Sequence, residues 1–425
     1  MAIFCCGLSV FSWSQSALDK LAVQYVKLGL HIGQYDGDFV DAYYGPDSLK
    51  PNSSKADQFP AEAFLRKIKS LRQKIKQAVS GKATTEELNR AGWMDDQLRA
   101  FAERVRMFKG QYHDFDTEAY ELFGVIVPHH TESYFKNELE KLDKILPGKG
   151  TVAERFQQLA NRFIVPPDKL DTVFKTAIHY SRKITKEHFV LPESEHCSLE
   201  FVKDKPWSGY NWYQGNYFSK VEINTDVNIF IERVVDVASH ESYPGHHVYN
   251  LLLEENLYRR KHYVEVSLYP LFSPQSLIAE GSANYGVGLV FPEEERLKFC
   301  KEVLLPISGL DTLGLSTYFT ALDLRDKLNY ARNEVARQFL NGKMTEEEGL
   351  HWLQDYCLMS SEGAKKSISF IKKYRSYVIN YNFGKDLVKR FVESGNKNRE
   401  GYWKKFGFLL SHEIRIKNLE KDLSH

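Results

Sequence analysis

The chain lacks the features that would assign it to several common classes of protein. It has only five cysteines in 425 residues, and its 57 basic and 56 acidic residues leave a formal net charge of +1. Balanced charge gives no electrostatic reason to expect a nucleic acid or an anionic membrane surface as a partner. No segment reaches about 18 uninterrupted apolar residues, so the sequence predicts no membrane span.

The few cysteines exclude two kinds of site. Cys5 and Cys6 lie near the N-terminus, and Cys197, Cys300 and Cys357 are widely spaced. An odd number of widely spaced thiols is neither a disulfide framework nor a CxxC metal site. We therefore interpret these thiols as packed side chains.

The N-terminal segment 2–13, AIFCCGLSVFSW, is apolar and rich in small residues, and Ser14-Gln15-Ser16 follows it. This pattern is typical of a secretory leader with a small-x-small cleavage site, although the basic start of such a leader is missing. The alternative is an apolar first segment of the mature protein. We favour a signal peptide over 1–16 and a periplasmic or secreted protein; otherwise the protein is cytoplasmic.

The rest of the chain has a mostly helical pattern. Apolar residues recur at helical spacing from Ala17 to Leu30 and again over 60–108, 132–145, 167–187, 228–239 and 303–421. Thr345 begins a T-x-x-E capping box. Between about 188 and 224 the helical period is lost, and FSKVEINT (218–225) alternates as a strand does. The sequence predicts a mainly α fold with a small antiparallel β-sheet, in which a helical region 17–180 and a catalytic region 181–425 form one continuous unit.

The stretch SHESYPGHHVYN (239–250) indicates metal chemistry. A hydrolytic zinc site needs three protein ligands, an open position for water and a base beside that water. His240 offers an imidazole, and Glu241 lies about 100° further around a helix, where it can face the bound water. In the common HExxH motif the second histidine follows four residues after the first, but Pro244 occupies that position here.

The identity of the second ligand depends on how the helix changes at Pro244 and Gly245. Proline removes a helical hydrogen bond and glycine tolerates unusual dihedral angles, so the sequence predicts a break or a bulge after Glu241. A bulge of two residues brings His246 to the ligand position, whereas a straight, kinked helix favours His247. We prefer His246 and keep His247 as the alternative.

The third ligand is expected on a following helix. Ser273 and Pro274 form a favourable helix start, and Glu280 then lies in the middle of LIAEGSA. A carboxylate among small and apolar neighbours needs a partner. A buried salt bridge to an arginine is the alternative role, but the preceding histidine motif favours a metal ligand.

Four segments, HESYPGHH, AEGSANYG, YQGNYFSKVEINTD and KYRSYVINYNFG, resemble an uncharacterised bacterial domain-of-unknown-function family. That family belongs with the zincin metallopeptidases, on the gluzincin side, and the resemblance extends over about 179–391. It implies a zincin-like architecture in which His240, one histidine of the His246-His247 pair and Glu280 bind Zn²⁺. Glu241 would then be the general base.

The same resemblance implies how a substrate is bound. FSKVEINT would be an edge strand that pairs with an extended peptide. Tyr381 would stabilise the oxyanion, and Arg375 would bind a substrate carboxylate. Ser282 departs from the family, in which a tryptophan is expected after the Glu-Gly of the second motif, and this change would reshape a pocket wall.

Together these residues predict a zinc-dependent hydrolase that cleaves short peptides as a carboxypeptidase or an oligopeptidase. Two other functions use the same residues. Two histidines and one carboxylate also bind iron in non-haem oxygenases, although such enzymes need no base at Glu241. The third hypothesis is a metal-containing protein that binds a partner without catalysis. The sequence indicates no oligomeric state.

Overall fold

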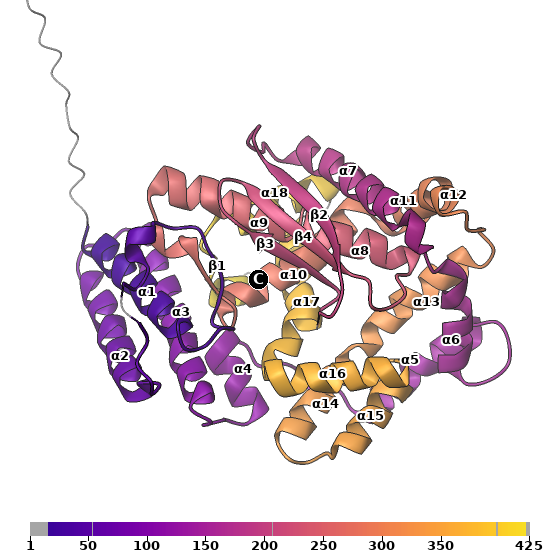
Figure 1. The fold of residues 1–425 in the computed structure, drawn as a ribbon, viewed down its shortest axis with the longest axis horizontal. Coiled ribbons are helices and arrows are strands. Elements are labelled where there is room, and N and C mark those ends of the chain that lie inside the picture. The colour runs from indigo at the N-terminus through magenta and orange to yellow at the C-terminus, as the bar shows by residue number, and fades with distance from the viewer. Residues whose placement is uncertain (1–15, 53, 206, 397, 422–425) are drawn as a thin grey trace, which may run out of the picture.

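Figure 1 shows the computed structural model of the chain, which is mostly helical and contains two small sheets. The structure describes residues 16–52, 54–205, 207–396 and 398–421. The strands are β1 (Val40–Tyr43), β2 (His196–Val202), β3 (Gly209–Tyr213), β4 (Phe218–Asn224) and β5 (Leu268–Pro270). The helices are α1 (Ala17–Gly33), α2 (Ala61–Ala78), α3 (Thr85–Phe108), α4 (Phe115–Phe123), α5 (Glu132–Ile145), α6 (Val152–Ala160), α7 (Leu170–His188), α8 (Ile231–Glu241), α9 (His246–Leu253), α10 (Pro274–Val290), α11 (Glu293–Phe299), α12 (Leu305–Ser308), α13 (Leu315–Leu328), α14 (Tyr330–Leu340), α15 (Glu346–Asp355), α16 (Ser361–Tyr374), α17 (Ile379–Glu393), α18 (Arg399–Ser411) and α19 (Ile416–Lys421).

The mainly helical fold class is confirmed, and short sequence signals explain where several helices begin. Thr345 and Glu348 form the expected capping box at the start of α15. Ser16 and Asp19 form another at the start of α1, so this helix begins where the apolar pattern begins. The rest of the expected signal peptide, 1–15, lies outside the described residues.

The larger sheet has three strands in the order β2-β4-β3. β2 runs parallel to β4, with His196 opposite Phe218, and β3 runs antiparallel to β4, with Gly209 opposite Ile223. FSKVEINT is therefore confirmed as a strand, β4. The sheet is mixed, however, and only the β3–β4 pair is antiparallel. The expected edge position of FSKVEINT is wrong, because β4 is paired on both sides.

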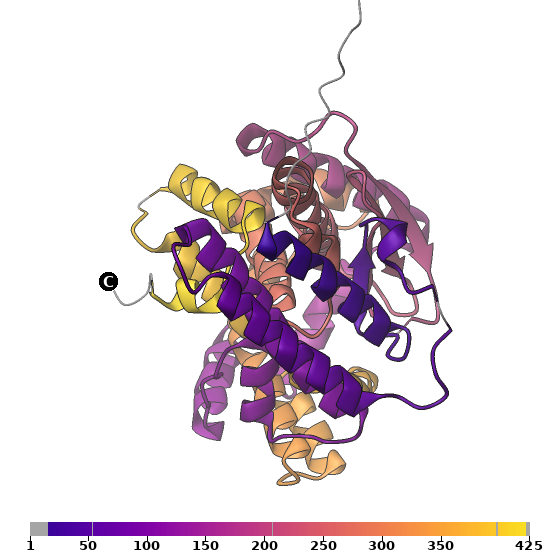
Figure 2. The same cartoon turned by 90° about the vertical axis from the view of Figure 1, so that its left-hand side faces the viewer.

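The N-terminal helices form a second hydrophobic core that is joined to the rest of the chain. α1, α2 and α3 pack on one another and on Leu268 of β5, as the indigo and violet helices of Figure 2 show. β1 pairs with β5, the strand that directly precedes α10. At the other end of the chain, Arg415 forms an ion pair with Asp96 of α3. These contacts attach the N-terminal region to the elements that carry the histidine motif.

α10 lies at the centre of the molecule, packed against α8 and α17. Nearly all of its residues are buried, which is why LIAEGSANYG has so few charges. Gly281 allows the close approach of α17, because a Cβ at this position would collide with the Gly384 carbonyl. The packing places Glu280, the one acidic residue of α10, in the interior.

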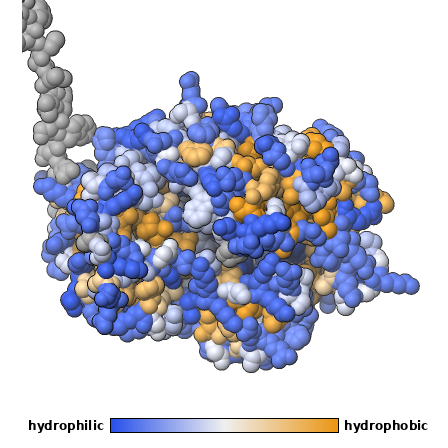
Figure 3. All heavy atoms as spheres, in the orientation of Figure 1, coloured by the Kyte–Doolittle hydropathy of each residue, from blue (hydrophilic) through white to orange (hydrophobic). Residues whose placement is uncertain are grey.

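The outer surface is predominantly polar. In Figure 3 hydrophilic side chains cover most of the visible face, and apolar groups form separate patches. Within the described part of the chain, no helix combines the length and the apolar character that crossing a bilayer requires.

Candidate metal centre

The HESYPGHH segment folds as two helices joined by a tight turn. α8 ends at Glu241 and α9 begins at His246, and Ser242 and Gly245 between them have non-helical backbone angles. The Gly245 N–H donates to the Ser239 carbonyl oxygen over 3.1 Å. A Cβ on residue 245 would collide with the backbone of His240, so this turn requires glycine. The break expected between Glu241 and His246 is therefore confirmed.

This turn brings two imidazoles to one carboxylate. His240 Nε2 lies 3.1 Å from His246 Nε2 and 3.2 Å from Glu280 Oε2. His246 Nε2 lies 3.7 Å from the same Glu280 oxygen. Glu241 Oε1 lies 4.0 Å from His240 Nε2 and completes the group. The four side chains come from three consecutive helices, α8, α9 and α10.

The three converging atoms fit a zinc ion. Zinc bound tetrahedrally at about 2.0–2.2 Å has ligand atoms about 3.3–3.6 Å apart, which is close to the separations among His240, His246 and Glu280. Glu280 Oε2 is buried and receives no hydrogen bond of normal geometry. Two imidazole nitrogens 3.1 Å apart also need a proton or a cation between them, because their lone pairs otherwise repel. The donor set therefore suits a divalent cation.

Two further side chains orient the ligands. Asn284 Nδ2 donates to the Tyr381 carbonyl at 3.0 Å, which leaves Asn284 Oδ1 as an acceptor 3.1 Å from His240 Nδ1. His240 therefore carries its proton on Nδ1 and directs Nε2 into the cluster. Tyr377 donates its hydroxyl hydrogen to Glu280 Oε1 at 2.9 Å. Sequence reasoning missed both residues, although the position of Asn284 four residues after Glu280, on the same helix face, was a usable signal.

Burial and charge set the pKa values of this cluster when protons are its only cations. Burial raises the pKa of Glu241, and this outweighs the opposite effect of the two histidines. Burial lowers the pKa of His246, but the nearby negative charge of Glu280, together with those of Glu241 and Asp41, outweighs burial and raises that pKa to about 9. Burial raises the pKa of Glu280, but His240 and His246 outweigh burial and hold the pKa of this carboxyl well below its usual range. Glu241 is thus the more basic of the two glutamates, as a general base should be.

His247, the alternative second ligand, belongs to another network. Its side chain is fully buried, with Nδ1 2.9 Å from Ser219 Oγ and Nε2 3.2 Å from Glu195 Oε2. Both ring nitrogens are therefore engaged by the protein. The structure turns His246, and not His247, toward His240.

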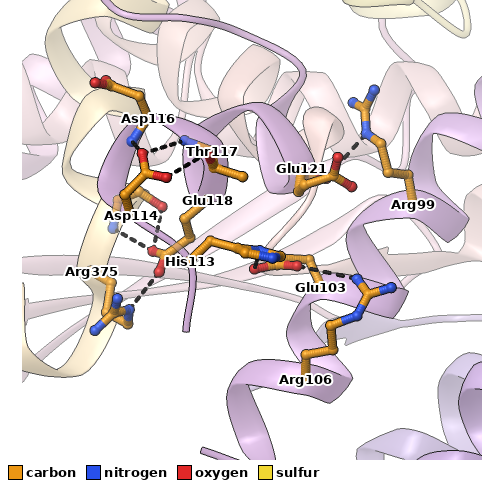
Figure 4. Close-up of polar contacts among 11 residues, drawn as sticks. Arg99, Glu103, Arg106, His113, Asp114, Asp116, Thr117, Glu118, Glu121 and Arg375 are labelled. Carbon is orange, nitrogen blue, oxygen red and sulfur yellow. Dashed lines mark hydrogen bonds and ion pairs between the residues drawn. The ribbon is translucent and has the colours of Figure 1, made fainter. Parts of the chain in front are cut away.

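The two residues expected to bind substrate have different surroundings. Tyr381 packs beside Tyr377 with ring centres 5.9 Å apart, and burial followed by the charge of Glu280 raises its pKa. Arg375 does not join the cluster. Its Nε donates to the buried carboxylate of Glu118 at 2.6 Å (Figure 4), and its guanidinium lies 4.2 Å from the ring centre of Tyr112. Arg375 is thus already paired with a buried carboxylate, which argues against the expected role of Arg375 in binding a substrate carboxylate.

The sheet edge beside the cluster is β3. Asn211 Nδ2 donates to the Glu241 carbonyl at 2.6 Å and so holds the end of α8 against this strand. Gly209 of β3 faces the Glu241 side chain, because a Cβ there would lie 3.1 Å from Glu241 Oε1. Tyr210, between them, donates to the carboxylate of Asp41 on β1. The edge strand beside Glu241 is therefore β3, and not FSKVEINT as the resemblance implied.

The comparisons with known proteins bear on the fold only. The sequence matches no protein-family model and no curated protein. In three dimensions the chain is similar to a predicted lipoprotein from Colwellia psychrerythraea, with a TM-score of 0.50 and 12% identity over 86% of this chain and 69% of that one. Trypanosoma cruzi metallocarboxypeptidase 1 matches with a TM-score of 0.49 and 10% identity over 96% and 94% of the two chains.

Proposed function

We propose that the protein is a zinc-dependent peptidase. The convergence of His240 Nε2, His246 Nε2 and Glu280 Oε2 within 3.1–3.7 Å of one another is the main support for this proposal. Two histidines and one glutamate leave a fourth coordination position for water or substrate, as in hydrolytic zinc sites. The nearby Glu241 carboxylate distinguishes the site from a purely structural one, because a structural site needs no base.

The chain's own residues supply the acid–base chemistry. Bound zinc would polarise the scissile carbonyl and lower the pKa of its water toward neutrality. Glu241 takes a proton from the attacking water and delivers it to the leaving amine, and its raised pKa suits both transfers. Tyr381, whose raised pKa keeps its phenol protonated, can donate a hydrogen bond to the oxyanion. Asn284 and Tyr377 keep His240 and Glu280 in place.

A peptide suits the surroundings of this site better than a compact substrate does. β3 is an edge strand, and no other strand of the described residues pairs with its outer side. Extended peptides bind such edges through main-chain hydrogen bonds. Gly209 and Asn211 on β3 lie against Glu241 at the end of α8, so a peptide paired with β3 would pass close to the general base.

Metal analysis combined with a peptide assay tests the proposal. The purified wild type should contain one zinc per chain and cleave members of a mixed peptide library. Glu241→Gln should keep the zinc and lose about 10²- to 10⁴-fold in kcat, the usual effect of removing a general base. Glu255→Gln is the matched control, because Glu255 pairs with Arg260 away from the cluster. Unchanged cleavage by Glu241→Gln would rule out its role as base, and a chain that binds iron and consumes oxygen would instead be an oxygenase.

A further inference from the structure

Arg332, near the start of α14, is an arginine without an acidic partner. Its guanidinium carbon lies 4.7 Å from the ring centre of Phe370. Its Nε is buried and has no hydrogen-bond partner, and no ion pair of Arg332 occurs among the described residues. Burial lowers its pKa, the expected effect of holding a cation away from water. Such a cation costs stability unless an anion pairs with it.

Two other arginines of this region are paired. Arg337, five residues further along α14, forms ion pairs with Glu334 at 2.5 Å and with Asp116 at 3.1 Å. Arg375 is bound by Glu118. The protein therefore supplies a carboxylate to Arg337 and to Arg375 but none to Arg332.

Aromatic rings connect Arg332 with the metal centre. Phe370 lies 6.1 Å from Tyr381 and 6.4 Å from Tyr377, and Tyr377 is hydrogen-bonded to Glu280. The Tyr381 phenol experiences charge from both directions. After burial, Glu280 raises its pKa, while Arg332 lowers it. Phe370 therefore lies beside both the Arg332 guanidinium and the two tyrosines, and one of these, Tyr377, is hydrogen-bonded to Glu280.

Contacts on both sides of Arg332 fix its position. The Tyr330 hydroxyl donates to Asp386 of α17 at 2.5 Å, and Asn333 exchanges hydrogen bonds of 2.9 and 3.0 Å with Asn382 of the same helix. These contacts prevent α14 from rotating relative to α17, which also carries Tyr381. The helix that carries Arg332 is thus fixed to the helix that carries the proposed oxyanion donor.

We propose that Arg332 binds the C-terminal carboxylate of the peptide substrate, so that the enzyme is a carboxypeptidase. The inference rests on the proposed function, and it assigns to Arg332 the role that the sequence suggested for Arg375. A guanidinium binds a carboxylate through two parallel hydrogen bonds, and such a pair is strong where water is excluded. In the reaction the water oxygen bonds to the scissile carbonyl carbon and the C–N bond breaks. Glu241 transfers the proton to the leaving amine, and the product that keeps its free C-terminus departs from Arg332.

Two peptides that differ only at the C-terminus test this assignment. The wild type should cleave a peptide with a free C-terminal carboxylate about 10- to 100-fold more efficiently, in kcat/KM, than the same peptide with a C-terminal amide. Arg332→Gln should reduce the kcat/KM of the free acid to that of the amide and leave the amide unchanged. Arg325→Gln is the matched control, because Arg325 stacks on Phe156 at 5.1 Å on the neighbouring helix α13. It should keep the preference for the free acid.

Binding and stability measurements separate the anchor from a structural role. In calorimetric titration of the zinc-free protein, N-acetylphenylalanine should bind the wild type and Arg325→Gln, and its amide should bind neither. Arg332→Gln should lose this binding and have an equal or higher Tm, because the substitution removes an unpaired buried cation. A lowered Tm with an unchanged preference for the free acid would mean that Arg332 is structural and would overturn the proposal.

The same experiments distinguish the failure of the two proposals. Equal cleavage of acid and amide by the wild type would exclude a carboxylate anchor while leaving the peptidase intact. Absence of cleavage, with N-acetylphenylalanine still bound through Arg332, would contradict the peptidase and support the anchor. Absence of both cleavage and binding would contradict both.

Discussion

Two adjacent histidines belong to two polar clusters of opposite kinds. His247 is fully buried, and both of its ring nitrogens have protein partners, Ser219 and Glu195. His246 instead faces His240 with no protein donor between the two nitrogens, and beside them Glu280 Oε2 has no hydrogen bond. Buried polar groups are normally paired. Both ring nitrogens of His247 therefore have their partners within the protein. The His246 cluster instead leaves polar atoms unpaired, which is what a binding site for a metal ion requires.

Glu195, the carboxylate partner of His247, is also fully hydrogen-bonded. Besides His247, its carboxylate accepts hydrogen bonds from Arg182 Nε at 2.8 Å and from the Tyr243 hydroxyl at 2.5 Å. Burial raises the pKa of Glu195, but these bonds outweigh it and lower the pKa overall. The network joins α7, the turn after α8, and α9. It therefore supports the turn that positions His246.

The largest expected effect comes from replacing His246. His246→Gln removes one of the three proposed zinc ligands, so zinc affinity should fall by more than the roughly 100-fold that loss of an outer partner causes. Peptide cleavage should fall with it. In the zinc-free protein the substitution should lower the Tm, because Glu280 loses one of the two imidazoles that stabilise its buried carboxylate. Zinc titration with a competing chelator and thermal unfolding measure the two quantities. A variant that keeps wild-type zinc affinity would show that His246 is not a ligand.

Replacing His247 should have a different effect. His247→Leu leaves Ser219 and Glu195 without one buried partner each, which should lower the free energy of unfolding by about 2–5 kcal/mol. The folded variant should still bind one zinc per chain, since no ligand has changed. Urea unfolding and metal analysis check this prediction. If His247→Leu lost zinc at unchanged stability, the roles of the two histidines would have to be exchanged.

The sequence predicts contacts between residues that are close along the chain better than contacts between distant ones. His240, Glu241 and His246 lie in one short motif, and its proline and glycine predict the break that redirects His246. Glu280 was predictable as a carboxylate in need of a partner. Partners far along the chain were not, because Glu118 lies 257 residues from Arg375 and Glu195 lies 52 residues from His247. A single sequence shows which buried groups need a partner but not which groups will meet.

The same limit explains the error in the sheet. Alternating side chains predict that FSKVEINT is a strand, because that pattern is a property of the segment itself. Whether β4 has one neighbour or two depends on how β2 and β3 pack against it, and β2 pairs with it only after a long loop and an intervening strand. The edge strand beside Glu241 could therefore be found only from the structure, in which Gly209 and Asn211 of β3 lie against the end of α8.

Glu232, outside the metal centre, also has an unpaired carboxylate oxygen, and it can be compared with Glu280. Glu232 Oε2 is buried without a hydrogen-bond partner, and burial followed by the charge of Asp236 raises its pKa from 4.5 to about 7. The folded protein thus keeps this proton to a higher pH than the unfolded chain. The Glu232 contribution to stability is therefore most favourable below pH 4.5 and is lost as the pH rises to about 7. Glu232→Gln should match the wild type in acid and exceed it at pH 8 by up to about 3 kcal/mol.

Urea unfolding of both proteins at a series of pH values measures this difference. Zinc content and peptide cleavage should be the same in the two proteins at pH 8, because no histidine pair converges on Glu232. A difference in stability that grew toward acid would have the wrong sign and would show that Glu232 is charged in the fold. Equal free energies of unfolding of the two proteins at every pH would mean that burial does not disfavour the charged form of Glu232.

The smallest expected effect concerns Asn284, which belongs to neither cluster but determines the tautomer of His240. Asn284→Ala removes the acceptor at His240 Nδ1 and should weaken zinc binding about 10- to 100-fold, with little change in the stability of the zinc-free protein. Asn284→Asp is the control, because it keeps an acceptor toward His240 and loses only the donor to the Tyr381 carbonyl. Competitive chelator titration should therefore rank the wild type and Asn284→Asp together, above Asn284→Ala. Equal zinc affinity in all three proteins would show that His240 keeps its tautomer without the hydrogen bond to Asn284. The His246 cluster would then depend less on neighbouring side chains than the His247 cluster does.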